Sequence, residues 1–320
     1  MRSYIITSLI AGIISLVVVF VFCCFVYPSF ALVPDSPSQK VQSPVHAPEI
    51  PHKIDFSGES VPLDYFDVRE SLDRELSSNV FFHSNIFLYM KRAARWFPVI
   101  EPILKENGIP DDFKYLALIE SNLMNVVSPS GAAGFWQFLE KTGLEFGLEI
   151  NSEIDERYHV ELSTRAACRY FKQAYVKFGT WTNVAASYNV GMTGFEKQLK
   201  GQKISSYYDL WLNEETSRYV FRILAVKLIL SDPEKYGFHP DKKEFYRDVP
   251  CKTVEVTGSV TDWTAFAFKN GTNYKLLKLM NPWIRGNKLV NVRKKTYQVK
   301  IADPSYREVT LFPDQQDSSE

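Results

Sequence analysis

The most hydrophobic part of the chain is a nearly unbroken apolar run over residues 5–27, which follows Arg2. A helix needs about 20 predominantly apolar residues to cross a hydrocarbon core of about 30 Å, and this run is 23 residues long. Ser29-Phe30-Ala31, a small-x-small pattern, also fits the cleavage site of a secretory signal. Residues 1–31 are therefore predicted to be a membrane anchor or a cleaved signal peptide, and both place the body of the protein outside the cytoplasm.

A proline-rich segment follows over residues 32–62. It contains six prolines and few large apolar residues. Proline-rich chains without an apolar pattern form stiff, extended linkers. This segment is therefore predicted to be a tether that holds a folded domain away from a membrane surface.

Residues 63–246 carry apolar positions at helical spacing and few strand signals, which predicts a mainly α domain. Pro98 and Pro102 are expected to begin a new helix, because an interior proline breaks the hydrogen-bond ladder. Ser163 is expected to cap the helix that follows it. The predicted helices cover residues 85–108, 110–121, 164–178, 181–190 and 215–230, with a short one that ends near Gly143.

Glu120 stands out in the second of these helices. Phe113, Leu116, Ala117 and Glu120 occupy one stripe, and the helix is apolar nearly all round, so it is expected to be central. Burial disfavours the ionised form of a carboxyl and raises its pKa, which suits a general acid near neutral pH. An ion pair with an arginine, or the cap of a neighbouring loop, is the structural alternative.

The pattern changes to β-α-α-β over residues 251–303, with strands near 253–256 and 296–301 and two short helices between them. Asp262 and Asn273 are expected to cap the two helices. Residues 304–320 are predicted to be a C-terminal tail.

Charge is unevenly distributed. The chain has no net charge, but residues 251–303 contain ten Lys and Arg against three Asp and Glu. A basic module favours either an anionic polymer or a solvated basic face, and a role in nucleic-acid binding is poorly supported in an exported chain. The four cysteines and five histidines show no disulfide or zinc spacing, so neither a metal nor a cofactor is expected. Lipidation of Cys23 or Cys24 is disfavoured by the bulky Phe22.

Five short motifs in order over residues 120–220 resemble the catalytic domain of family-1 lytic transglycosylases. They are Glu120-Ser121, Ser128-Pro129-Ser130-Gly131-Ala132-Ala133-Gly134-Phe135-Trp136-Gln137-Phe138, Ser163-Thr164-Arg165-Ala166-Ala167, Ser187-Tyr188-Asn189-Val190-Gly191 and Glu215-Thr216-Ser217-Arg218-Tyr219-Val220. Ser187 departs from the alanine that the family usually has before Tyr-Asn. The resemblance extends over residues 61–246.

The resemblance implies a lysozyme-like, all-α fold with a glycan-binding groove. Glu120 would protonate the bond between N-acetylmuramic acid and N-acetylglucosamine and then activate the muramyl C6 hydroxyl, which closes a 1,6-anhydro ring. Substrate-binding roles would fall to Ser121 near the scissile bond, to Gln137 with its loop, to Tyr188 by hydrogen bonding beside Glu120, to Asn189, and to Tyr219. Trp136 is expected to be a core anchor. Four other acidic residues are expected to be surface charges: Glu140, Glu145, Asp155 and Glu156. Asp155 and Arg157 are expected to form a pair that holds a loop in place.

The β-α-α-β unit resembles a LysM domain, which binds N-acetylglucosamine polymers, although Gly258-Ser259-Val260-Thr261-Asp262 replaces the usual Gly-Asp. Glycan binding and a purely structural cap are both open. The predicted partners are peptidoglycan strands, the membrane, and cell-wall synthesis or division proteins. The predicted location is the periplasmic side of the cell envelope. A water-using muramidase of the same fold and a non-catalytic wall-binding protein are the alternative functions.

Overall fold

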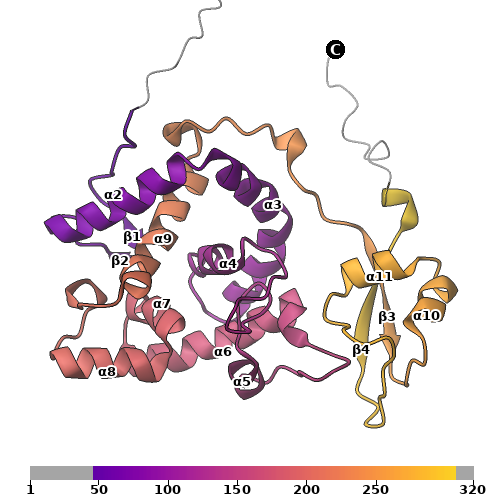
Figure 1. Ribbon diagram of the computed structural model, residues 1–320. Helices are drawn as coiled ribbons and strands as arrows, with labels where there is room; N and C mark the ends of the chain where they lie inside the picture. Colours follow the sequence, from indigo (N-terminus) through magenta and orange to yellow (C-terminus); the bar gives the residue numbers. More distant parts are fainter. Residues whose placement is uncertain (1–45, 308–320) are drawn as a thin grey trace, which may run out of the picture. The chain divides into compact units, whose positions relative to one another are not determined.

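The computed structural model describes residues 46–307 (Figure 1). The elements below all lie in one compact unit that begins at Ala47. The predicted anchor or signal (residues 1–31) lies outside the described residues, as do the first part of the predicted linker and most of the predicted tail. No helix within residues 46–307 is both long enough and apolar enough to cross a membrane.

The larger domain is helical, as predicted. In chain order its α-helices are α2 (Phe66–Val80), α3 (His83–Glu106), α4 (Phe113–Ser121), α5 (Glu140–Glu145), α6 (Val160–Phe178), α7 (Trp181–Val190), α8 (Met192–Gln202) and α9 (Glu214–Ser231). Figure 1 shows α4 between α3 and α9, and it contacts both. Every residue of α4 except Lys114 and Glu120 is buried. The helix that carries Glu120 is therefore central, as its apolar pattern predicted.

The prediction for Pro98 and Pro102 is wrong, because both lie inside α3. The two prolines are exposed and one turn apart, whereas Ile100, Ile103 and Leu104 of the same helix are buried. An interior proline costs about 3 kcal/mol, and burial of each large aliphatic side chain contributes roughly 1.5–3 kcal/mol. Because α3 buries seven residues, its packed face keeps the helix continuous.

One further local prediction is wrong, and one helix was missed. α6 begins at Val160, so Ser163 lies inside the helix instead of capping it, and its hydroxyl donates to the Val160 carbonyl at 3.2 Å. α8 was not predicted, because Phe195 is its one buried residue and two glycines interrupt its pattern.

The predicted tether ends earlier than residue 62. Strands β1 (Asp55–Phe56) and β2 (Glu59–Ser60) form a short hairpin, and Phe56 is fully buried against Phe113, with ring centroids 5.5 Å apart. The Glu59 carboxylate accepts hydrogen bonds from the backbone N–H groups of Trp181 at 2.6 Å and Thr182 at 2.9 Å. These groups have no partner within α7, so Glu59 caps that helix from a distant part of the sequence.

The smaller domain has the predicted β-α-α-β order, with β3 (Cys251–Val256), α10 (Trp263–Lys269), α11 (Tyr274–Met280) and β4 (Tyr297–Ala302). The strands are antiparallel, with Val254 opposite Val299. The predicted caps are confirmed: the side chains of Asp262 and Asn273 accept from the backbone N–H groups at the start of α10 and α11. Trp263 fills the core with no exposed surface.

Replacing Glu59 by alanine should destabilise the helical domain, because the first turn of α7 loses a charged cap. We expect a loss of about 1–2 kcal/mol in the free energy of unfolding, measured by urea denaturation. Glu70→Ala is the matched control, because Glu70 lies exposed on α2. A Glu59→Ala variant as stable as this control would contradict the capping role.

Candidate active site

Glu120 lies in the last turn of α4, where the chain turns through Asn122 in the left-handed conformation (φ 55°). Its side chain is half-buried, and the Tyr219 hydroxyl donates a short hydrogen bond to Oε1. Tyr219 comes from α9 and is 2% exposed. Two helices that are distant in sequence therefore bring a carboxyl and a phenol together.

Burial raises the pKa of Glu120 from 4.5 to about 7. The hydrogen bond from Tyr219 and the charge of Arg222 act in the opposite direction, and the negative charge of Glu215 adds to the increase. Arg222 donates to the Ile119 carbonyl at 3.4 Å, and within residues 46–307 Glu120 forms no ion pair. The arginine-paired alternative is therefore not the observed arrangement.

Tyr188 lies near Glu120 but does not form the hydrogen bond that was expected of it. Its hydroxyl donates to the Trp136 carbonyl at 2.6 Å. Burial raises the pKa of Tyr188 well above its ordinary value, and the charge of Glu120 adds to this increase. Tyr219 thus occupies the bonding role predicted for Tyr188, because only the packing of α9 against α4 decides which phenol reaches the carboxyl.

Ser121 is 4% exposed, and its hydroxyl is shared between the carbonyls of Phe135 at 2.9 Å and Ala117 at 3.2 Å. It therefore ties α4 to the loop of residues 131–138, which we call the active-site loop. A direct contact of this buried hydroxyl with a substrate, as the sequence suggested, is not what its position favours. The neighbouring Glu120 takes the exposed side of the same helix turn.

Gln137 is half-buried in the active-site loop, with a positive φ of 47°. Its amide nitrogen donates to the carbonyls of Gly134 at 2.8 Å and Val126 at 3.2 Å. Trp136 is fully buried and donates to the Thr164 hydroxyl at 2.9 Å, so its predicted role as a core anchor is confirmed.

Asn189 connects the end of α7 to the start of α9. Its amide donates to Glu215 at 3.3 Å and its oxygen accepts from the Thr216 hydroxyl at 2.8 Å. Glu215 is one of the charges that raise the pKa of Glu120. Asn189 therefore acts on the site through the placement of Glu215.

The predicted tie between Asp155 and Arg157 is confirmed. The two side chains form an ion pair at 2.7 Å, and Arg157 also donates to the carbonyls of Gly131 at 3.0 Å and Phe138 at 3.1 Å. Gly134 has a φ of 78°, and a Cβ there would lie 1.9 Å from the Arg157 carbonyl oxygen. The loop and the Arg157 segment therefore pack backbone to backbone.

Asp155 and Glu156 are not surface charges, as the sequence suggested. They are 7% and 5% exposed, and Lys295 of the smaller domain pairs with Glu156 at 2.7 Å. Glu140 and Glu145 are exposed, as predicted.

A cavity of about 740 Å³ lies beside the end of α4. Ile119 and Asn122, which flank Glu120 in sequence, form part of its wall, as do Glu215 and Arg222. The Glu120 carboxyl itself, Tyr188 and Gln137 do not line it. Polar side chains dominate the remaining wall, together with two aromatic rings and one valine: Glu75, Ser78, Asn79, Phe82, Asn85, Tyr89, Glu214, Arg218 and Val226. Amides, charges and aromatic rings suit the hydroxyls and the apolar faces of a sugar.

Sequence reasoning missed the pair of Glu75 and Arg218 in this wall. Glu75 is 2% exposed, and Arg218 donates to it at 2.6 Å. Arg218 lies in a motif that was singled out, but Glu75 lies in the polar helix α2, 143 residues earlier. Within the described residues, no group of three or more His, Cys, Asp or Glu side chains is placed to hold a metal ion.

Comparisons with known proteins match two segments of the chain. Residues 97–210 match the transglycosylase SLT domain, and residues 252–305 match the soluble lytic transglycosylase C-terminal LysM-like domain. Membrane-bound lytic murein transglycosylase D of Escherichia coli K12 is 27% identical over 231 residues, which cover 69% of this chain and 49% of that protein. The same protein of strain CFT073 is equally similar. The chain spans about half the length of these relatives, and the predicted recognition of both domains is confirmed.

The pKa of Glu120 predicts a specific dependence of stability on pH. The folded-state pKa lies above the unfolded value of 4.5, so this carboxyl favours folding at low pH, and that contribution is lost as the pH rises through about 7. The loss is at most about 3 kcal/mol, and solvent access to the half-buried group reduces it. In urea denaturation, Glu120→Gln should therefore be more stable, relative to the natural protein, at pH 8 than at pH 4.5. An unchanged difference between the two pH values would contradict the raised pKa.

Proposed function

We propose that this chain is a peptidoglycan lytic transglycosylase, which cleaves the β-1,4 bond between N-acetylmuramic acid and N-acetylglucosamine and leaves 1,6-anhydromuramyl ends. The observation that carries the proposal is Glu120, a carboxyl with a pKa of about 7 that is bonded to Tyr219 inside a segment matching the SLT domain. The domain match supports the class of reaction. The site geometry supports Glu120 as the residue that performs it.

In this mechanism Glu120 performs two proton transfers. Its protonated carboxyl gives a proton to the glycosidic oxygen as the bond to the muramyl C1 breaks. The resulting carboxylate then takes the proton of the C6 hydroxyl, whose oxygen forms the new bond to C1. Glu120 ends protonated again and no water is consumed. A pKa near neutrality suits both steps, because the group must exchange its proton in each direction.

A second catalytic carboxylate is not required by this chemistry, in contrast to hydrolases that use two. Glu215 is close enough to raise the pKa of Glu120, but its carboxylate is engaged by Asn189 at 3.3 Å. We assign Glu215 an electrostatic role and Asn189 the task of holding it. Tyr219 is proposed to orient the Glu120 carboxyl, and Ser121 and Tyr188 to hold the active-site loop that carries Gln137.

The place of action follows from the substrate. Transglycosylases of this class act on cell-wall peptidoglycan in the envelope. We further propose that residues 1–31 export or anchor the protein on the periplasmic side, and that residues 63–246 form the catalytic domain together with the β1–β2 hairpin. Cell-wall synthesis or division proteins are the proposed partners.

Digestion of purified sacculi tests the function directly. We expect 1,6-anhydro-muropeptides by mass spectrometry, and a loss of activity of about 10²–10⁴-fold in Glu120→Gln because its acid and base are removed. Glu234→Gln is the matched control, since Glu234 is exposed. Reducing ends would identify a muramidase instead, and the absence of any product would identify a non-catalytic wall-binding protein.

Tyr219→Phe should move the pH profile of kcat/KM. The lost hydrogen bond lowers the pKa of Glu120 in the natural protein, so the pKa in the variant rises above about 7. The limb of the profile that requires protonated Glu120 should shift to higher pH. Tyr65→Phe, at an exposed tyrosine, should leave the profile in place, and an unshifted Tyr219→Phe profile would contradict the coupling.

A further inference from the structure

The smaller domain packs directly on residues 149–158 of the larger one, which we call the docking segment. Ile154 forms an antiparallel bridge with Ile284, and the Asp155 N–H donates to the Trp283 carbonyl at 2.9 Å. The Arg285 N–H donates to the Glu153 carbonyl at 2.8 Å. Backbone pairing of this kind fixes the register of two surfaces, which a flexibly tethered module does not need.

One hydrophobic core spans both domains. Ile154 and Tyr158 of the docking segment and Ala133 of the active-site loop are buried in the same cluster as Trp283 and Ile284. These three residues are 1%, 5% and 1% exposed. The smaller domain therefore covers part of the active-site loop itself.

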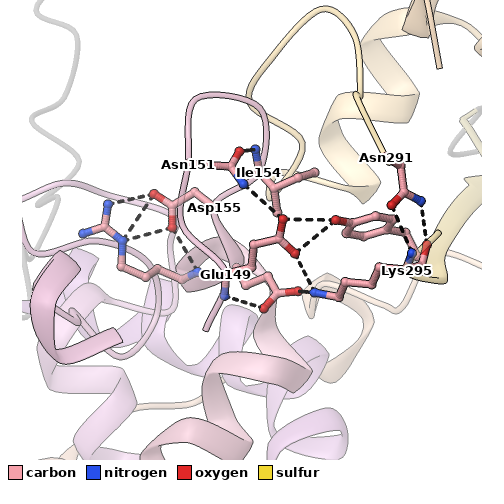
Figure 2. Close-up of polar contacts among 9 residues, drawn as sticks. Glu149, Asn151, Ile154, Asp155, Asn291 and Lys295 are labelled. Atoms are coloured by element: carbon pink, nitrogen blue, oxygen red, sulfur yellow. Dashed lines mark hydrogen bonds and ion pairs between the residues drawn. The ribbon is translucent and has the colours of Figure 1, made fainter. Parts of the chain in front are cut away.

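A polar network also joins the two domains, and Lys295 is part of it (Figure 2). Its ammonium group donates to Glu149 at 2.6 Å and to the buried Glu156 at 2.7 Å. The Tyr297 hydroxyl also donates to Glu149, at 3.0 Å. The Asn291 side chain accepts a hydrogen bond from the backbone N–H of Lys295 at 3.0 Å and donates one to the backbone carbonyl of Lys295 at 2.7 Å. Part of the basic excess of the smaller domain therefore neutralises carboxylates of the larger one.

The docking segment in turn holds the active-site loop. Asp155 orients Arg157, whose guanidinium donates to the carbonyls at both ends of the loop, Gly131 and Phe138. The far side of the loop is tied to Ser121 and Tyr188. A continuous set of contacts thus connects Lys295 to the surroundings of Glu120.

From these contacts we infer that the LysM-like domain is a fixed support of the active-site loop, with Lys295 as a positioning residue. Its consequence for catalysis rests on the proposed function. Removal of the Lys295 charge leaves two neighbouring carboxylates, one of them buried, without their cation. The docking segment should then separate more often from the smaller domain, and the active-site loop should lose its position.

Lys295→Met in the full chain tests this role, because methionine keeps the aliphatic stem without the charge. Peptides covering residues 131–158 should exchange amide hydrogen about tenfold faster by mass spectrometry, because the docked segment opens more often. The kcat on peptidoglycan should fall about tenfold, with KM within about twofold, since a displaced loop affects positioning more than binding. Lys295→Arg should restore most of both properties.

Lys269→Met is the matched control, because Lys269 is exposed at the end of α10 in the same domain. It should change neither exchange nor kcat. Tyr297→Phe removes one donor to Glu149 without changing charge, and it should give a smaller increase in exchange. This variant decides the question if Lys295→Met does not fold by circular dichroism.

Unchanged exchange over residues 131–158 in both Lys295→Met and Tyr297→Phe would overturn the inference. If Lys295→Met lost sacculus binding but kept its full kcat, the inference would also be overturned, because the domain would then be a glycan-binding module. If the natural protein itself released no product from peptidoglycan, the proposed function would fail, whereas the exchange result would still decide the support role.

Discussion

The site depends on a carboxyl at the end of a helix that is otherwise buried. Glu120 is placed by α4, whose other faces pack against α3 and α9, so the helix cannot rotate to expose it. Removing a carboxylate from water is unfavourable, and here the opposing interactions are one hydrogen bond from Tyr219 and the charge of Arg222, with no ion pair among the described residues. The proton is therefore held weakly enough to be given up near neutral pH and strongly enough to be regained.

The surrounding contacts act on that carboxyl through two routes. One is electrostatic, because Asn189 holds Glu215 and Arg222 approaches the end of α4, with opposite effects on the pKa of Glu120. The other is geometric, because Ser121 and Tyr188 fix the active-site loop through backbone carbonyls. Because these side chains bond to its backbone, the loop has little freedom to move.

The arrangement of the two domains extends the geometric route. The β-α-α-β unit shares a core with the docking segment and neutralises its carboxylates. A small domain that resembles a glycan-binding module thus packs against the segment that holds the active-site loop. Its fold alone does not decide between these roles, since function depends on the contacts that a particular surface makes.

Elements whose signals are local could be predicted from the amino-acid sequence. Helical spacing predicted α4 and its central position, with Glu120 on it. The bounds of α7 were predicted from Trp181 and Gly191, and the starts of α10 and α11 from their capping residues. The tertiary structure decided which distant groups meet: Tyr219 and not Tyr188 at Glu120, Glu59 at the start of α7, Glu75 with Arg218, and Lys295 with Glu156. Periodicity and capping act over a few residues of chain, whereas these pairs join segments 99 to 143 residues apart and are fixed only when the helices pack.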